Sequence, residues 1–267
     1  MVPPDRRLRR PNAAIAFTDS EGDGTPVVLT HGAGLDRTMF DAQAQALEGA
    51  GYRVITWDLR AHGASTLAPG TRFTATDALD DLDALLTACR IDRAVLVGHS
   101  LGGNLAQAFA RARSDRVLGL IAMDSTWNTG PLSALERRAL RLAAPSLALV
   151  PARRLPGLMA RASAVSPWAV ERVEQTFARM PKPVFLDVWR AVVSFVDPDP
   201  GYRSPVPLGL VRGAQDRTGN IATAMPRWAE AEGASEFVIP GAGHLVTWDA
   251  PEAASGALLR ILGGWTP

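Results

Sequence analysis

The stretch Ala94-Val95-Leu96-Val97-Gly98-His99-Ser100-Leu101-Gly102-Gly103 decides the fold of this chain. Its first four residues are apolar, which favours a buried strand, and residues 101–113 have the spacing of an amphipathic helix. The pentapeptide between them, Gly98 to Gly102, has the pattern G-x-S-x-G. Glycines flank the serine because a sharp strand-to-helix turn strains the backbone and leaves room only for small neighbours. The stretch therefore predicts a turn that raises Ser100 Oγ above the sheet at the positive end of a helix.

Outward from this turn, short apolar runs alternate with segments of helical period. Runs without polar alternation are typical of strands covered on both faces, and their alternation with helices predicts a parallel α/β sheet with right-handed crossovers. The expected strands are 27–30, 54–57, 94–97, 117–123, 208–212 and 237–239, and the expected helices are about 37–50, 74–89, 101–113, 222–232 and 252–262. At the start, Arg6 to Arg10 and Ala13 to Thr18 favour an antiparallel edge hairpin, although a solvated basic arm fits the same residues.

The alternation of strands and helices stops between Thr126 and about Pro205. Amphipathic stretches near 132–144, 151–163, 168–179 and 182–195 are separated by Pro145, Pro151, Pro167, Pro181 and Pro183. Because proline breaks helix interiors and is tolerated in a first turn, these residues predict several short helices. We interpret residues 126–204 as an all-helical insertion into one core made of 1–125 and 205–267. The alternative is a helical excursion without a function of its own.

Composition excludes several classes of protein. The 267 residues are 47% hydrophobic and 21% charged, which is typical of a globular chain that can bury a sizeable core. The 28 basic and 27 acidic residues leave a net charge of +1, so we expect neither a nucleic acid nor a membrane as partner. The apolar run from Ala13 to Phe17 is too short for a secretory signal or a membrane span, and Cys89 is the only cysteine. We expect a cytoplasmic protein that acts on a small molecule. Its oligomeric state is not indicated.

A serine hydroxyl needs a base before it becomes a good nucleophile, and histidine is the usual one. His99 adjoins Ser100, and we expect its side chain to point away from the hydroxyl. His31 and His62 lie in glycine-containing loops, where we expect loop hydrogen bonding or, for His31, shaping of the loop that binds the oxyanion. His244 follows the strand expected at 237–239, which can lie beside the strand before Ser100. By elimination, His244 is predicted to be the base.

The imidazole needs a carboxylate that orients it. Asp216 follows the strand expected at 208–212, at the same edge of the sheet, and is the leading residue for this role. Asp124 ends the strand at 117–123 and is the alternative. Asp197 and Asp199 lie in a proline-rich stretch that is typical of solvated turns.

Backbone N–H groups are predicted to stabilise the oxyanion of such a reaction. His31-Gly32-Ala33-Gly34 follows the first core strand, so the N–H groups of Ala33 and Leu101 could both face a tetrahedral intermediate, each contributing roughly 3–4 kcal/mol. A tight turn without a catalytic role is the alternative for this loop, and Asp58 to Ser65 is interpreted as a structural loop. The residues expected to line the substrate site are Gly32, Trp127, Leu245 and Val246.

Taken in order, five motifs resemble those of the α/β-hydrolase fold superfamily, in its serine-nucleophile branch. They are His31 to Gly34, Asp58 to Ser65, Gly98 to Gly103, Gly213 to Asp216 and Gly241 to His244. The resemblance implies a mostly parallel eight-stranded sheet flanked by helices, a nucleophile–acid–histidine triad of Ser100, Asp216 and His244, and a helical cap after the sixth strand. Residues 126–204 correspond to that cap.

The residues and the resemblance together predict a hydrolase that cleaves a carboxylic ester or lactone of a small apolar substrate through an acyl-enzyme, without a metal or an organic cofactor. Dehalogenases and epoxide hydrolases of the superfamily carry Asp as nucleophile, so Ser100 disfavours those reactions. Carbon–carbon hydrolases commonly carry Asn before the serine and Trp after the histidine, where this chain has His99 and Leu245. The alternatives are carbon–carbon cleavage, perhydrolysis or transacylation by the same triad, and a small-molecule receptor with little turnover.

Overall fold

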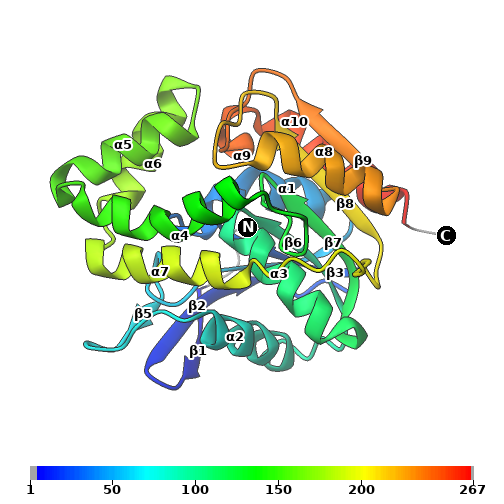
Figure 1. Ribbon diagram of the computed structural model, residues 1–267. Helices are drawn as coiled ribbons and strands as arrows, with labels where there is room; N and C mark the ends of the chain where they lie inside the picture. Colours follow the sequence, from blue (N-terminus) through cyan, green and yellow to red (C-terminus); the bar gives the residue numbers. More distant parts are fainter. Residues whose placement is uncertain (1–4, 266–267) are drawn as a thin grey trace.

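A single mixed sheet forms the centre of the computed structural model, which describes residues 5–265 (Figure 1). Eight strands follow the order β1-β2-β4-β3-β6-β7-β8-β9, and a short β5 pairs with β2. The strands are β1 Arg6–Arg10, β2 Ala13–Asp19, β3 Pro26–Thr30, β4 Arg53–Trp57, β5 Thr66–Leu67, β6 Ala94–His99, β7 Val117–Met123, β8 Leu208–Gly213 and β9 Ser235–Ile239. Pairing is parallel from β4 to β9 and antiparallel at β1 and β2. The mostly parallel sheet and the edge hairpin are confirmed.

Helices cover the sheet on both faces. Helices α1 and α10 pack against each other over one face, and α2 and α3 pack against each other over the other. The core helices are α1 Asp41–Gly49, α2 Ala75–Ala88, α3 Leu101–Ala112, α8 Ile221–Glu232, α9 Val246–Asp249 and α10 Pro251–Gly263. Within residues 5–265, none of the helices combines the length and the apolar character that crossing a bilayer requires.

Four further helices lie between β7 and β8, where the sequence predicts a helical insertion. They are α4 Ala134–Leu149, α5 Leu155–Ser163, α6 Pro167–Phe177 and α7 Lys182–Phe195. Figure 1 shows α5 and α6 extending from the body of the molecule, with α4 and α7 running between them and α3. Residues 124–207 contain no strand.

The prediction that Pro145 separates two helices is wrong, because this proline lies inside α4. The missing N–H of a proline leaves the carbonyl four residues earlier without its helical donor. Here Arg141, which bears that carbonyl, and Pro145 are both exposed, so water can hydrate the group. A capping box between Ser133 and Glu136 also stabilises the start of α4.

The loop from Asp58 to Ser65 is structural, as expected. The Asp58 carboxylate accepts hydrogen bonds from the backbone N–H groups of Arg37, at 2.7 Å, and Ala64, at 2.8 Å. Arg60 forms a bidentate, buried ion pair with Asp81 of α2, with N–O distances of 2.7 and 2.8 Å. These contacts join the loop after β4 to its neighbours.

The strand that precedes His244 is not beside the strand that precedes Ser100, and this corrects the sequence-based expectation. Two strands, β7 and β8, separate β9 from β6. Instead, the loop after β9 crosses back over the end of β8, where the N–H of Gln215 donates to the carbonyl of Ala242 at 2.8 Å. A Cβ on Gly213 would lie 2.0 Å from the carbonyl oxygen of Gly243, so only glycine permits this crossing. The crossing brings His244 back toward β6.

Candidate active site

Ser100 sits in a strained turn between β6 and α3. Its backbone angles, φ 51° and ψ −114°, lie in the left-handed half of the map that non-glycine residues rarely adopt. A Cβ on Gly98 would lie 2.2 Å from the carbonyl oxygen of Gly102, and one on Gly102 would lie 2.1 Å from that of Thr30. The surrounding packing therefore requires glycine at both positions, and the turn has the geometry that the pentapeptide predicts.

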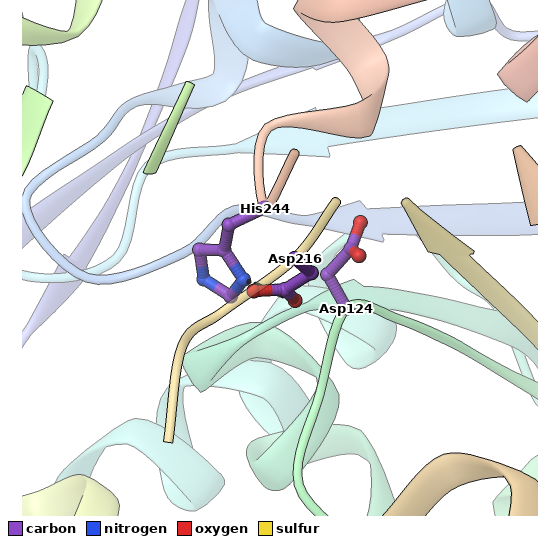
Figure 2. Close-up of side chains that lie close together, drawn as sticks. All are labelled: Asp124, Asp216 and His244. Atoms are coloured by element: carbon purple, nitrogen blue, oxygen red, sulfur yellow. Dashed lines mark hydrogen bonds and ion pairs between the residues drawn. The ribbon is translucent and has the colours of Figure 1, made fainter. Parts of the chain in front are cut away.

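His244 and Asp216 form a buried pair (Figure 2). Nδ1 of His244 donates to Oδ2 of Asp216 at 2.9 Å, and Oδ1 of Asp216 accepts from the N–H of Thr218 at 2.7 Å. Burial acts to raise the pKa of Asp216, but the charge and hydrogen bond of His244 outweigh it and hold that pKa below its ordinary value. Because Nδ1 donates to Asp216, Nε2 is the ring nitrogen of His244 that is left to accept a proton.

Asp124 lies next to this pair without joining it. Figure 2 shows Asp216 between His244 and Asp124. Oδ1 of Asp124 accepts from the N–H of Gly213 at 2.8 Å, while its buried Oδ2 has no partner among the described residues. Burial, and then the charge of Asp216, raise the pKa of Asp124 well above its ordinary value. Of the two carboxyl groups that the sequence offers, the structure places Asp216 on His244.

These three side chains are also a set of metal-ligand types. One ligand atom from each of Asp124, Asp216 and His244 lies within 4.8 Å of the others. However, Nδ1 of His244 donates its proton to Asp216 and is not available as a ligand. The cluster is therefore better described as a hydrogen-bonded pair of His244 and Asp216, with Asp124 beside it, than as a metal centre.

Ser100 and His244 line one small cavity of about 30 Å³, called here the Ser100 cavity. Its remaining walls include Ala33 and Leu245 from the core and Met159, Phe177 and Trp189 from α5, α6 and α7. No hydrogen bond joins the side chains of Ser100 and His244 in the described part of the chain. Contacts between such groups are often long in free enzymes and tighten when a substrate binds. Nε1 of Trp189 is buried without a partner among residues 5–265, so an N–H donor is available beside this cavity.

Two backbone N–H groups beside Ser100 are free. Leu101 is the first residue of α3, where N–H groups have no acceptor within the helix, and Ala33 lies in the loop after β3. In residues 5–265 no backbone acceptor pairs with either group. His31 shapes the loop of Ala33: its Nδ1 donates to the carbonyl of Gly32 at 2.8 Å, and its Nε2 accepts from the N–H of Leu59 at 2.9 Å. Burial lowers the pKa of His31, which therefore stays neutral.

The four residues predicted to line the substrate site do not all lie at the Ser100 cavity. Leu245 lines the Ser100 cavity, and Gly32 lies against Ser100, since a Cβ on Gly32 would be 3.3 Å from the serine Cβ. Val246 is buried as the first residue of α9. Trp127 does not line the Ser100 cavity, so the prediction that it lines the substrate site is wrong. It stacks on Trp228, with ring centroids 6.1 Å apart, and borders a different and larger cavity against α3 and α8.

Two residues that position His244 were missed by sequence reasoning. Nε2 of His99 donates to the carbonyl of His244 at 2.7 Å, and burial lowers the pKa of His99 to about 3, so this ring stays neutral. The Asp249 carboxylate accepts from the N–H groups of Gly243, Val165 and Ser166, at 2.9, 3.1 and 2.8 Å. Asp249 thereby joins the loop of His244 to the α5–α6 connection. The position of His99 beside Ser100 was a usable signal, whereas no local pattern marks Asp249.

Comparison with known proteins adds to this geometry. An sn-1-specific diacylglycerol lipase from Danio rerio is 35% identical over 107 residues, which are 40% of this chain and 33% of the lipase. A non-heme chloroperoxidase from Kitasatospora aureofaciens is 37% identical over 111 residues, which are 41% of this chain and 40% of the chloroperoxidase. The chain thus spans about a third to two-fifths of the length of these curated relatives.

Similarity to solved structures extends over the whole chain. The structure of a thermophilic esterase from Thermogutta terrifontis superimposes with a TM-score of 0.78 and 29% identity, covering 99% of this chain and 100% of that one. The profile of the alpha/beta hydrolase family matches residues 27–257. This match covers the sheet from β3 onward, the four inserted helices and all three side chains of the candidate triad. The chain belongs to the alpha/beta hydrolase family.

Proposed function

We propose that this protein is a serine hydrolase that cleaves a carboxylic ester or lactone of a small apolar substrate through an acyl-enzyme. The observation that carries the proposal is the Ser100 cavity, which Ser100, His244 and Ala33 line together. Asp216 accepts a hydrogen bond from Nδ1 of His244 and so orients the ring. A hydroxyl, an imidazole and a carboxylate arranged in this sequence are the components of acyl transfer.

The first half of the reaction forms the acyl-enzyme. Ser100 Oγ attacks the carbonyl carbon while Nε2 of His244 takes the hydroxyl proton, and Asp216 stabilises the resulting imidazolium. The N–H groups of Ala33 and Leu101 donate to the oxyanion of the tetrahedral intermediate. His244 then returns the proton to the leaving alkoxide, and the alcohol departs.

The second half releases the acyl group. A water molecule takes the place of the alcohol, His244 removes its proton, and hydroxide attacks the ester of Ser100. Collapse of the second tetrahedral intermediate breaks the bond to Ser100 Oγ, which regains the proton from His244. No redox chemistry enters these steps.

We assign residues 126–204 as a cap on a core of 1–125 and 205–267. Helices α5, α6 and α7 contribute Met159, Phe177 and Trp189 to the walls of the Ser100 cavity. A change in these residues therefore alters which substrates reach Ser100, while the groups that react all come from the core. Met159, Phe177 and Trp189 are largely apolar, which supports a small apolar substrate.

The test is a panel of ester and lactone substrates of graded chain length, run with Ser100→Ala beside the unchanged protein. The expected loss in kcat for the variant is about 10⁶-fold. A fluorophosphonate should label Ser100 in the folded protein, with the adduct located by peptide mass spectrometry, and should not label heat-denatured protein. Full esterase activity in Ser100→Ala, or no turnover and no labelling in the unchanged protein, contradicts the proposal.

Perhydrolysis is the second candidate, favoured by the 37% identity to a chloroperoxidase. The same acyl-enzyme would yield a peracid if hydrogen peroxide replaced water as the attacking nucleophile. Product analysis with peroxide competing against water separates the two reactions, because hydrolysis leaves only the carboxylic acid.

A further inference from the structure

The Ser100 cavity is too small to hold an ester. Its volume of about 30 Å³ is comparable to the share of one water molecule in the liquid, whereas small-molecule sites usually measure roughly 300–1,000 Å³. If Ser100 acts on esters, as proposed above, the rest of the substrate must lie in an adjoining space.

A second cavity of about 370 Å³ lies among helices of the 126–204 segment. We call it the outer cavity. Its apolar walls are Leu155 and Pro156 of α5, Phe177 of α6, Met180, and Phe185 of α7. Arg153 and Lys182 also line it, and Nζ of Lys182 donates to the backbone carbonyls of Ala148 and Val150. The volume falls within the range of small-molecule sites, and the apolar walls suit an apolar group.

The two cavities follow each other along the same helices. On α5, Leu155 lines the outer cavity, and Met159, one turn later, lines the Ser100 cavity. On α7, Phe185 and Trp189 repeat this relationship, and their rings are 6.0 Å apart. Residues four apart lie on one face of a helix, so the two cavities lie one after the other along the same faces of α5 and α7.

Phe177 is the partition on this path, because it lines both cavities. Its ring lies against the loop of Ala33: a Cβ on Gly34 would be 2.5 Å from the ring. The ring also packs edge-on against Phe185, with centroids 5.5 Å apart. Among the described residues, only apolar contacts hold the Phe177 side chain in place. A change of its rotamer therefore breaks no hydrogen bond.

We propose that the outer cavity is the binding site for an uncharged apolar arm of the substrate, and that displacement of the Phe177 ring joins this cavity to Ser100. The substrate class is then an ester or lactone with an extended hydrocarbon chain. Each methylene buried in such a site contributes about 0.8 kcal/mol, which is about fourfold in kcat/KM.

The experiment measures kcat/KM for 4-nitrophenyl esters from acetate to dodecanoate. Ala178 lines the outer cavity and is exposed, so the indole of Ala178→Trp fills the cavity without entering the core. The matched control is Gln175→Trp, at an exposed position of α6 three residues before Ala178. We expect Ala178→Trp to lower the ratio of octanoate to acetate hydrolysis by at least about tenfold, and Gln175→Trp to leave it unchanged. Octyl acetate beside 4-nitrophenyl octanoate shows whether the arm belongs to the alcohol or to the acid.

Phe177→Ala tests the partition separately. Removing the ring joins the two cavities permanently, so the octanoate-to-acetate ratio should rise. An unchanged chain-length profile in both Ala178→Trp and Phe177→Ala overturns the proposal.

A binding measurement distinguishes failure of this inference from failure of the proposed function. Alkan-2-ones from butanone to decanone are titrated calorimetrically into Ser100→Ala protein, which needs no turnover. Affinity that rises with chain length and is lost in Ala178→Trp supports the outer cavity even if no ester is hydrolysed. Affinity that does not depend on chain length, or that survives in Ala178→Trp, contradicts it.

Discussion

Asp124 and Asp216 follow neighbouring strands of the sheet, yet Nδ1 of His244 donates to Asp216 alone, at 2.9 Å. Asp124 accepts instead from the backbone N–H of Gly213. Burial and the charge of Asp216 raise the pKa of Asp124, whereas the contact with His244 lowers the pKa of Asp216 against the effect of burial. The pKa values of two carboxyl groups at one edge of the sheet are thus shifted in opposite directions, because only Asp216 contacts His244.

Replacing each of these two residues with asparagine should separate their roles. Asp216→Asn presents an amide to Nδ1 of His244, which disfavours the tautomer needed at Nε2, so we expect kcat to fall about 10⁴-fold. Asp124→Asn keeps an oxygen for the N–H of Gly213 and leaves the hydrogen bond between His244 and Asp216 in place, so we expect kcat to fall by less than about tenfold. Initial rates on the best ester of the panel provide the measurement. A larger loss in Asp124→Asn would transfer the orienting role to Asp124.

Stability should decrease in acid through His62. This ring is buried in the loop after β4, and burial, followed by the electrostatic effect of the neighbouring His31 ring, lowers its pKa from 6.5 to about 3. Between these values the unfolded chain binds a proton that the folded protein does not, so lowering the pH through this interval favours unfolding. In His62→Gln, the difference in unfolding free energy between pH 7 and pH 5 should shrink by about 2 kcal/mol. Urea unfolding followed by circular dichroism at both pH values tests this, and an unaltered pH dependence refutes it.

We expect Asp249 to contribute more to the free energy of unfolding than a partly exposed carboxylate usually does. Asp249→Ala leaves the N–H groups of Gly243, Val165 and Ser166 without their acceptor, and we expect a loss of about 2–4 kcal/mol. Urea unfolding and hydrogen exchange at these three amides provide the measurement. Asp249→Asn keeps one oxygen acceptor and should lose less. Equal stability of Asp249→Ala and the unchanged protein would show that the three hydrogen bonds contribute little.

Local patterns were sufficient for most of the fold. The strand predicted at 117–123 and the helix at 182–195 have these bounds in the structure, because an apolar run or an amphipathic period is a property of neighbouring residues. Strand β5 was missed because two residues, Thr66 and Leu67, are too few to form a pattern. Pro145 was misjudged because the cost of a proline inside a helix depends on whether the lost hydrogen bond is exposed, which the sequence does not record.

The strained turn at Ser100 followed from the sequence alone, because the pentapeptide is a local pattern and a Cβ on Gly98 would collide with Gly102, four residues later. Only the tertiary structure decided that Asp216 rather than Asp124 contacts His244, and that the loop of His244 returns across two strands to reach Ser100. It also decided that Trp127 packs on Trp228 while Phe177 lies over the loop of Ala33. These contacts join residues far apart in the sequence, and they depend on strand order and on how side chains fill the space between elements. Neither the strand order nor the packing of side chains between elements can be read from the spacing of neighbouring residues.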